Sequence, residues 1–475
     1  MPWLTERAVS GSLSAGRVFA KDCDLPDPLD LADYERRPDL LAAAAQRRHA
    51  DGWLHGHPRV MDYPKPSGGL RRMTRLDPIA DVIYRQLVGR VVAADGALFD
   101  GVHNTRVESV PGGWRSVPWR KARSRYEEDL KRKREADQGA VKLDVREHYD
   151  TVSPALVMLV LNSAGIPSGA VGEMAAWLRA LDEIPGCGSG LPTGPEGSAV
   201  LGTLALLPLD RALARDGYDL VRWSDDYVVP VSGPEDLELV IALAQANLER
   251  NGQRLNLGKC VYLGPGEGPG AVSQIDIGEH LVDPGSELEV LAWMEEPQGV
   301  TQTLGLLRRD GDSRGVGTLK AHRWILERFP RQSAAYLRSV SEDVEWEWVL
   351  DAVLSPTTPE NAAAQLHLQR AVPRQVWGPE EAKRLFAMGW ELDRRKFSPL
   401  ANQCFATAGR SGERASVRQR RALEAAVELS DLDAQRGLLR AFERSGGVSR
   451  SSRIGLTHLR RTSPELAAAT DWAAA

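Results

Sequence analysis

The middle of the chain alternates between short apolar runs and longer amphipathic segments. The run VKLDV at 141–145 predicts a buried strand, because it is brief and mostly apolar. The next segment predicts a helix, since Ser153 suits an N-cap, Pro154 suits the first helical position and Gly165 suits the end. The sequence therefore predicts a strand that leads directly into a helix.

The pattern continues through a second group of elements. A Gly- and Pro-rich stretch, IPGCGSGLPTGPEGS, leads into an apolar run that predicts a helix starting near Ser198. DLVRW and YVVPV flank SDD and predict a tight hairpin; GPEDLELVIALAQANLERNG then predicts a helix and RLNLGKCVYL a strand. This order predicts a βαββαβ core in an α+β protein, with the helices on one face of an antiparallel sheet.

Both flanks of this core have helical patterns. Residues 1–60 are helix-prone, most clearly over DLLAAAAQRR, and PKPSGG marks a turn after them. In the last third of the chain, amphipathic segments such as PEEAKRLFAMGWELDRR follow one another with short breaks, so we expect an all-α domain of stacked helix pairs. The expected parts of the chain are residues 1–60, 61–140, 141–285 and 286–475.

Length and composition agree with several domains. A chain of 475 residues is longer than one hydrophobic core usually absorbs. No stretch approaches the roughly 18 uncharged apolar residues that span a bilayer, and the first residues lack the apolar core of a secretory signal. The cysteines form no C-x-x-C pair, which favours a reducing compartment. We therefore expect a cytoplasmic protein without a membrane partner.

A formal net charge of -5 means that any polyanion must be bound by a local basic patch. The densest patch interleaves Trp114, Trp119 and Tyr126 with cations, and such aromatics can stack on bases while the cations neutralise phosphates. A solvated helix with pairs such as Glu127 and Lys131 explains the same pattern equally well. The residues predicted to bind nucleic acid are Arg115, Arg120, Lys121, Arg123 and Arg125.

Three carboxylates carry the candidate chemistry. Asp144 ends the predicted strand, and Asp225 and Asp226 lie at the tip of the predicted hairpin. Like charges at close range raise one another's pKa values, and two divalent cations would resolve that conflict. Hard oxygen ligands suit Mg²⁺, with Mn²⁺ as the alternative. An Asp-Asp pair alone also fits a helix cap or an ordinary turn.

Five motifs, taken together and in order, resemble the reverse transcriptase family. DVREHYD resembles its first catalytic motif, GLPTGPEGSAVLGTLALLPLD its second, RWSDDYV its third and LNLGKC its fourth. PKPSGGLRR resembles the segment of the fingers that contacts the incoming triphosphate, and the motifs together cover residues 63 to 263. The second motif is closest to bacterial abortive-infection and defence-associated reverse transcriptases, which commonly append a helical-repeat domain. Ser224 departs from the family, which more often has a small apolar residue there.

The resemblance implies a right-hand polymerase. Residues 61–140 would be the fingers, 141–285 a ferredoxin-like palm, and 286–475 a helical domain in the thumb position, after an N-terminal helical extension. Asp144 and Asp225 would ligate two Mg²⁺ ions, helped by the carbonyl of Val145, and Asp226 would be a weaker ligand. Lys259 would protonate the leaving pyrophosphate; the alternative is a solvated lysine at a strand end.

The resemblance also assigns nucleotide contacts. Tyr149 would lie under the sugar and exclude a 2′-hydroxyl, unless it only packs in the core, and the neighbouring His148 is expected to point away from the site on the strand pleat. Arg71, helped by Lys65, would bind the triphosphate, with Arg72 as the alternative by one register. A loop of small residues would let the backbone approach the base pair and primer: Gly190, Pro192, Thr193 and Gly194.

The expected function is DNA synthesis from deoxynucleotides, with an RNA template or a DNA product as partner, in bacterial antiphage defence. A homo-oligomer or a partner from the defence system is also expected. The alternatives are a retroelement or repair enzyme, and a catalytically weak palm that senses a nucleic acid or a partner. Synthesis without a template, or primed by the hydroxyl of Tyr336, is open as well, although a buried helix-face aromatic explains Tyr336 better.

Overall fold

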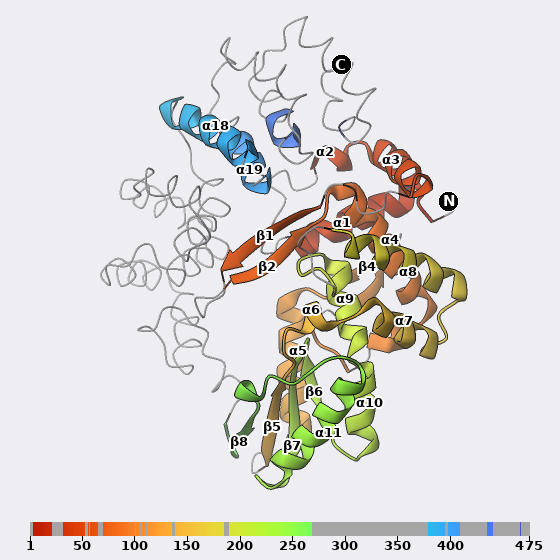
Figure 1. The fold of residues 1–475 in the computed structure, drawn as a ribbon, viewed down its shortest axis with the longest axis vertical. Helices are drawn as coiled ribbons and strands as arrows, with labels where there is room; N and C mark the ends of the chain where they lie inside the picture. Colours follow the sequence, from red (N-terminus) through yellow and green to blue (C-terminus); the bar gives the residue numbers. More distant parts are fainter. Residues whose placement is uncertain are drawn as a thin grey trace, which may run out of the picture. The chain divides into compact units, whose positions relative to one another are not determined.

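The computed structural model divides the chain into two units (Figure 1). One unit comprises Met1–Asp24, Tyr34–Val60 and Met73–Ala271; the other comprises Leu25–Asp33, Met61–Arg72 and Val272–Ala475. The residues that the structure describes are 3–20, 32–52, 56, 58–64, 70–99, 101–104, 107–110, 113–134, 138–184, 190–267, 379–394, 398–408, 435–439 and 466.

Helices form the first part of the chain, as the sequence predicts. They are α1 (Glu6–Ala20), α2 (Ala32–Glu35) and α3 (Pro38–Ala50), and α4 (Pro78–Ala94) follows further along. Asp77 begins α4, because its side chain accepts hydrogen bonds from the amides of Ile79 and Ala80. The same carboxylate forms a buried ion pair with Arg48 of α3, at 2.6 Å between Nη1 and Oδ1.

Two small two-stranded sheets are formed by segments that precede the central sheet in the chain, and the sequence pattern did not predict them. β1 (Arg59–Pro64) pairs with β2 (Leu70–Arg75), and β3 (Val107–Val110) pairs antiparallel with β4 (Gly113–Ser116). A short 3-10 turn, η1 (Gly96–Phe99), precedes β3, and α5 (Trp119–Lys133) follows β4. Both hairpins are short and rich in Arg and Gly, so neither has a run of alternating apolar residues that could identify it.

The central sheet has four antiparallel strands in the order β6-β7-β5-β8. The strands are β5 (Gly139–Asp144), β6 (Val221–Trp223), β7 (Asp226–Val231) and β8 (Val261–Leu263). The helices between β5 and β6 are α6 (His148–Thr151), α7 (Pro154–Ser163), α8 (Ser168–Asp182), α9 (Glu196–Ala205) and α10 (Leu207–Arg215). Between β7 and β8 lie α11 (Asp236–Arg250) and a 3-10 turn, η2 (Leu257–Lys259). The α+β class is therefore confirmed.

Local signals placed most of these elements correctly. The Ser153 side chain caps α7 by accepting from the Leu156 amide, and Pro154 begins the helix. α9 begins at Glu196, two residues before the predicted start, because Pro195 is its N-cap. The predicted last strand is shorter than expected, since only 261–263 pair with β5 along the ladder and residues 257–259 form η2.

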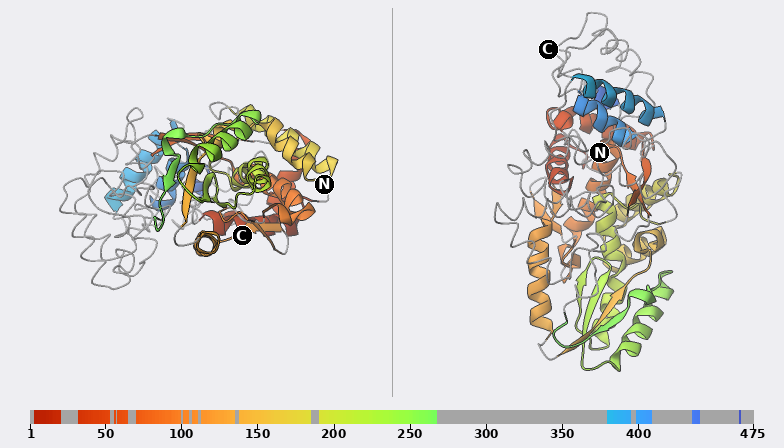
Figure 2. Two further views of the ribbon diagram at one scale, coloured as in Figure 1. Left: turned by 90° about the horizontal axis from the view of Figure 1, so that it is seen from below. Right: turned by 90° about the vertical axis from the view of Figure 1, so that its left-hand side faces the viewer.

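The core helices α10 and α11 pack on one face of the central sheet, as expected, and α5, which precedes the βαββαβ core, covers the other face. On one face Val141 and Leu143 of β5 and Tyr227 and Val229 of β7 pack with apolar residues of α10 and α11. On the other face Leu130 of α5 packs against a small cluster of Ala140, Val228 and Leu263. Figure 2 (right) shows α5 and α11 on opposite sides of the strands. The face that carries α5 is the one on which Asp144 and Asp226 lie, because side chains alternate along a strand.

In the second unit α18 (Pro379–Arg394) and α19 (Ser398–Ala408) pack against each other. Phe405 of α19 contacts two rings of α18, Phe386 and Trp390, at centroid distances of 6.0 and 5.4 Å. Both helices lie where the sequence predicts helical structure. The expected repeat of helix pairs and the remaining predicted segments lie mostly outside the described residues.

One stretch of helix among the described residues, Glu196–Arg215, is long and apolar enough to cross a membrane by length and composition alone. It comprises α9 and α10, and 72% of it is buried within the protein. A core helix of a globular domain has the same properties, so this stretch is explained by its packing.

The buried ion pair of Arg48 and Asp77 yields a stability prediction. Asp77→Asn removes the charge of this carboxylate from a site where both side chains are 2% exposed. We expect the free energy of unfolding, measured by urea denaturation, to fall by about 3–5 kcal/mol. The control is Asp39→Asn, which breaks the exposed Arg37 pair and should lower it by less than about 1 kcal/mol. Equal losses in the two variants would contradict the prediction.

Candidate functional site

The strand register brings the predicted carboxylates to one end of the central sheet. Asp144, the last residue of β5, is the cross-strand partner of Asp226, the first residue of β7. Ser224 and Asp225 form the turn between β6 and β7, in which Ser224 has a φ of 56°. A two-residue hairpin with a positive φ at its first central position matches the twist of antiparallel strands. Asp225 is thus next to the Asp144–Asp226 pair by chain connection.

Electrostatics shows that these carboxylates interact. Burial, together with the like charges of Asp225 and Asp144, raises the pKa of Asp226 to about 6, although Lys142 and Lys259 oppose the shift. Asp144 itself is only 13% exposed. The site therefore concentrates negative charge with little solvent around it, which favours a cation nearby.

The backbone after β5 turns the carbonyl of Val145 toward the end of the sheet where Asp144 and Asp226 lie. Asn256 donates its amide to the Asp144 carbonyl, and Arg146 donates its amide to the Arg254 carbonyl, both at 2.8 Å. Val145 and Leu255 therefore form a non-hydrogen-bonded antiparallel pair, in which the backbone groups of each residue point away from the partner. The Val145 carbonyl accordingly faces the β7 side of β5, where the Ser224–Asp225 turn lies.

A buried polar network holds the hairpin in this position. Arg222 of β6 is 0% exposed and forms an ion pair with Asp210 of α10, at 2.7 Å between Nη2 and Oδ2. Its Nη1 donates to the carbonyl of Ser224 at 3.2 Å, which ties the turn to α10. Tyr227 of β7 donates its hydroxyl to Asp210 at 2.7 Å, and burial raises the pKa of this phenol well above its ordinary value.

Sequence reasoning missed this network. The arginine was included in the third motif, but nothing in the sequence identified Asp210 as its partner. Asp210 lies in LPLDRAL, at the end of an apolar run. The one signal that the sequence offers for it is a single acidic residue near the start of a helix.

Lys259 lies close to the carboxylates, in η2. Its Nζ is 3.1 Å from Oδ1 of Asp144, while the lysine side chain remains 65% exposed. The ammonium of Lys259 is thus the cation next to Asp144. A lysine in this position neutralises one carboxylate directly, and it is close enough to meet a phosphate that approaches the same side chain.

The donor set suits a hard divalent cation in chemical type, since it consists of carboxylates and a backbone carbonyl. Among the residues that the structure describes, however, no three His, Cys, Asp or Glu side chains are grouped so as to hold one cation. The strand register thus brings together the residues that would ligate a metal, and the ammonium of Lys259 contacts one of them, Asp144.

The predicted loop of small residues packs against two other motifs. Leu191 donates its amide to the Tyr149 carbonyl at 2.8 Å, and Thr74 at the end of β2 donates to the Thr193 carbonyl at 2.7 Å. Gly194 has a φ of 128°, and a Cβ there would lie 2.4 Å from the Thr74 carbonyl oxygen, so only glycine fits. Gly190 and Pro192 are buried in the same loop.

The basic patch around α5 differs from the prediction. Trp114 and Tyr126 are 4% and 3% exposed, so they belong to the core and cannot stack on bases. Arg123 lies over the rings of Tyr126 and Trp223 and forms an ion pair with Glu127. Glu108 is within 4 Å of three of the predicted nucleic-acid residues: Arg115, Lys121 and Arg125.

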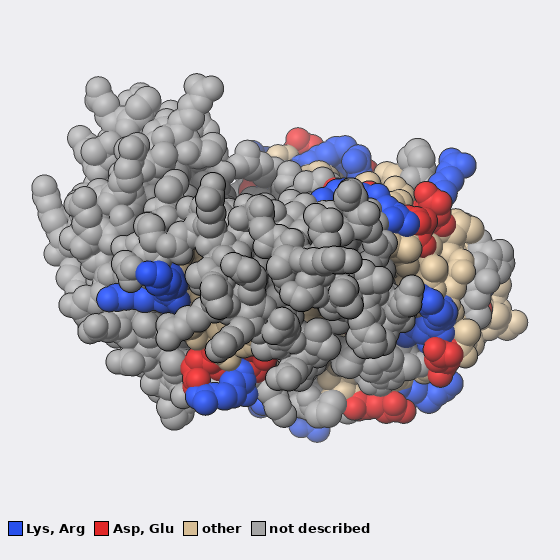
Figure 3. All heavy atoms as spheres, turned by 90° about the horizontal axis from the view of Figure 1, so that it is seen from above, with Lys and Arg blue, Asp and Glu red and all other residues tan. Residues whose placement is uncertain are grey.

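The patch is consequently an ion-pair network in which acidic groups offset much of the positive charge. On the face in Figure 3, described basic and acidic side chains likewise lie next to one another. The solvated-helix interpretation fits these contacts better than a dedicated stacking surface.

The other predicted residues are distributed as follows. Arg71 and Arg72 are exposed on β2, in the part of that strand that belongs to the second unit. Lys65 and Tyr336 lie outside the described residues, and the side chain of Arg120 in α5 does as well. Tyr149 is half-buried in α6.

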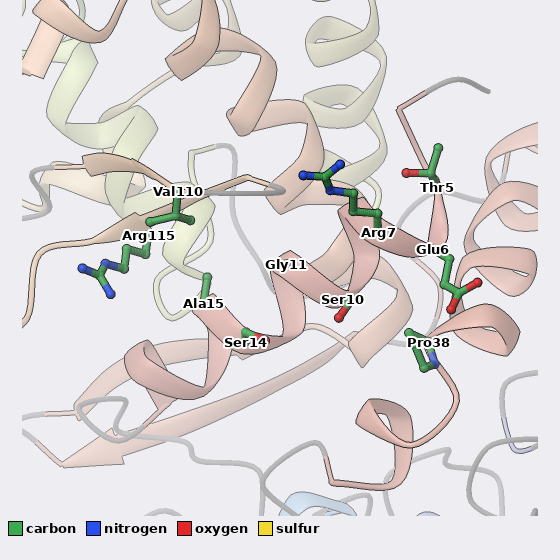
Figure 4. Close-up of a pocket in the computed structure, with 10 residues that line it drawn as sticks. All are labelled: Thr5, Glu6, Arg7, Ser10, Gly11, Ser14, Ala15, Pro38, Val110 and Arg115. Atoms are coloured by element: carbon green, nitrogen blue, oxygen red, sulfur yellow. The ribbon is translucent and has the colours of Figure 1, made fainter.

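A cavity of about 750 Å³ lies along α1, away from the carboxylates. Figure 4 shows Arg7, Ser10, Gly11 and Ser14 of α1 on one side and Arg115 of β4 on the other. Among the described residues that line the cavity, Arg115 is the one member of the predicted nucleic-acid set. None of the predicted catalytic residues contributes to its wall.

Comparison with known proteins adds no further information. No protein-family model matches the chain, and no curated protein matches it.

His148 yields a prediction about pH. Its ring is 4% exposed, and burial lowers its pKa to about 4 from the ordinary 6.5. The unfolded chain therefore takes up more protons than the folded one as the pH falls from about 6.5 to about 4, so the free energy of unfolding should decrease in this window, by on the order of 3 kcal/mol. Urea denaturation at several pH values measures this decrease. His148→Gln should lose this part of the pH dependence, and an equally steep decrease in that variant would contradict the assignment.

Proposed function

We propose that this chain is a reverse transcriptase-like DNA polymerase that joins deoxynucleotides by two-metal phosphoryl transfer. The observation that carries the proposal is the register of β5 and β7, which pairs Asp144 with Asp226 and puts Asp225 in the adjoining turn. The raised pKa of Asp226, caused first by burial and then by the like charges of Asp225 and Asp144, supports it, because bound cations would stabilise the ionised carboxylates.

Asp144 and Asp225 would hold two Mg²⁺ ions, with the Val145 carbonyl completing one coordination sphere and Asp226 as a weaker ligand. When bound, such a pair of ions stabilises the attacking and leaving oxygens of an in-line displacement. Arg222 keeps the hairpin, and with it Asp225, in place through the Ser224 carbonyl. Lys259 would leave Asp144 and donate a proton to the leaving pyrophosphate once metal ions neutralise that carboxylate.

The remaining motif residues would bind the nucleotide and the nucleic acid. The loop of Gly190, Pro192, Thr193 and Gly194 would approach the base pair through its backbone, and Tyr149, which this loop contacts, would exclude ribonucleotides. Arg71, Arg72 and Lys65 would bind the triphosphate. Within this proposal the four-stranded sheet is the palm of a right-hand polymerase, residues 61–140 are its fingers and residues 286–475 are a helical domain in the thumb position.

The proposed role is antiphage defence in the bacterial cytoplasm, with an RNA template or DNA product and with a second copy or a defence protein as partner. This part depends only on the resemblance of the second motif to defence-associated enzymes. A retroelement or repair role is compatible with the same active site.

One observation favours a second candidate, a palm that binds nucleic acid or a partner without catalysis. Lys259 already neutralises Asp144, with its Nζ 3.1 Å from Oδ1. A palm of this kind would be stable without divalent ions, whereas a polymerase would not turn over without them.

Nucleotide incorporation separates the two candidates. Purified protein with Mg²⁺ and labelled deoxynucleotides should form acid-insoluble product, and Asp225→Asn should reduce the rate by at least about a hundredfold, since a ligand of both ions is lost. The matched control is Asp219→Asn, which removes an exposed carboxylate just before β6 and should leave the rate within about twofold of the original.

Equal incorporation by the unaltered protein and Asp225→Asn would contradict the proposed site. Absence of incorporation from every protein, over a range of RNA and DNA templates and with Mn²⁺ in place of Mg²⁺, would favour the binding-module candidate.

A further inference from the structure

The backbone of Tyr149 is fixed from two directions. Directly before α6, Glu147 has a φ of 46°, a left-handed conformation that a side chain of this size rarely adopts unless its surroundings impose it. On the other side, Leu191 donates its amide to the Tyr149 carbonyl. The preceding Gly190 is so close that a Cβ there would lie 2.2 Å from the same oxygen.

The ring of Tyr149 is fixed as well, because it lies against α9 at Gly202. A Cβ on Gly202 would lie 3.3 Å from Cε1 of Tyr149 and 3.1 Å from Nε2 of His148. The two aromatic rings are neighbours, with centroids 5.3 Å apart. The Tyr149 ring therefore has no free space between itself and the helix.

His148 joins three segments of the proposed site. Its Nε2 is 3.1 Å from the Gly202 carbonyl oxygen, which can only accept, so Nε2 carries the proton. Its Nδ1 then accepts from the amide nitrogen of Gln253 at 3.0 Å. Gln253 is 1% exposed and lies just before residues 254–256, which pair with the end of β5. His148 was expected to point away from the site because of the strand pleat. It lies instead in a helix, α6, and its ring is buried between α9 and Gln253.

Resting on the proposed function, we propose that His148 and Gly202 are positioning residues that set the selectivity of Tyr149 for deoxynucleotides. A ring excludes a 2′-hydroxyl only if it cannot retreat when a ribonucleotide enters. Here the α9 backbone at Gly202 prevents the Tyr149 ring from moving toward α9. The hydrogen-bonded imidazole of His148 prevents the ring from moving toward His148. Neither residue needs to touch the nucleotide.

The experiment measures the ratio of kcat/KM for a deoxynucleotide to that for the matching ribonucleotide. Gly202→Ala inserts a methyl group 3.1 Å from Nε2 of His148 and 3.3 Å from Cε1 of Tyr149, so that both rings must give by a few tenths of an ångström. We expect the ratio to change by about fivefold or more, a coupling of the size seen between side chains in contact, and mainly through the KM values. Gly172→Ala is the matched control, because a Cβ at this position of α8 meets nothing within 4 Å, and its ratio should be unchanged.

A double variant tests whether the effect passes through the tyrosine. In a Tyr149→Ala background, Gly202→Ala should change the ratio by less than about twofold, since the ring that it displaces is gone. His148→Phe keeps a ring in the buried site but removes both hydrogen bonds that hold it, and it should lower the ratio while the protein remains folded by circular dichroism.

The outcomes separate this inference from the proposed function. Incorporation with an unchanged ratio in both Gly202→Ala and His148→Phe would overturn the positioning role alone. The same change of ratio with and without Tyr149 would also overturn it. If the unaltered protein incorporates no nucleotide, the proposed function is wrong, and this inference is wrong with it.

Discussion

The antiparallel register of β5 and β7 is the constraint on which the rest of the structure depends. It pairs Asp144 with Asp226 on one face of the sheet and leaves Asp225 in the adjoining turn. The rise in the pKa of Asp226 from 3.8 to about 6 corresponds to roughly 3 kcal/mol of unfavourable free energy at neutral pH. Burial of one or two apolar side chains offsets a loss of this size, at about 1.5–3 kcal/mol each.

The opposite face of the same strands supplies that burial many times over. Val141, Leu143, Tyr227 and Val229 alternate with the charged positions and are each 0% exposed. A slip of the register by one residue would move these side chains out of the core, so the apolar face fixes where the carboxylates meet. Arg222 then orders the hairpin tip, because its guanidinium links α10 to the Ser224 carbonyl from a fully buried position.

The sequence predicted the elements whose signals are local. The strand over 141–145, the helix after Ser153 and the hairpin around SDD depend on short apolar runs, an N-cap and a turn, and the structure has all three. It did not predict contacts between distant segments. Asp210 with Arg222 and His148 with Gln253 join residues whose pairing has no sequence signal. Trp114 and Tyr126 are buried, which favours the solvated-helix interpretation of the basic patch over the stacking one. In α5, Tyr126 points inward although cations surround it in the sequence, so composition alone left the two interpretations of the patch open.

The most direct test of the central claim is a count of bound Mn²⁺ by electron paramagnetic resonance, in the presence of a non-hydrolysable deoxynucleoside triphosphate. If Asp144 and Asp225 share cations, the unaltered protein should retain about two ions per chain after subtraction of those bound to free nucleotide, and Asp144→Asn should lose them. Retention of no ions, or of equal numbers by both proteins, would contradict the account.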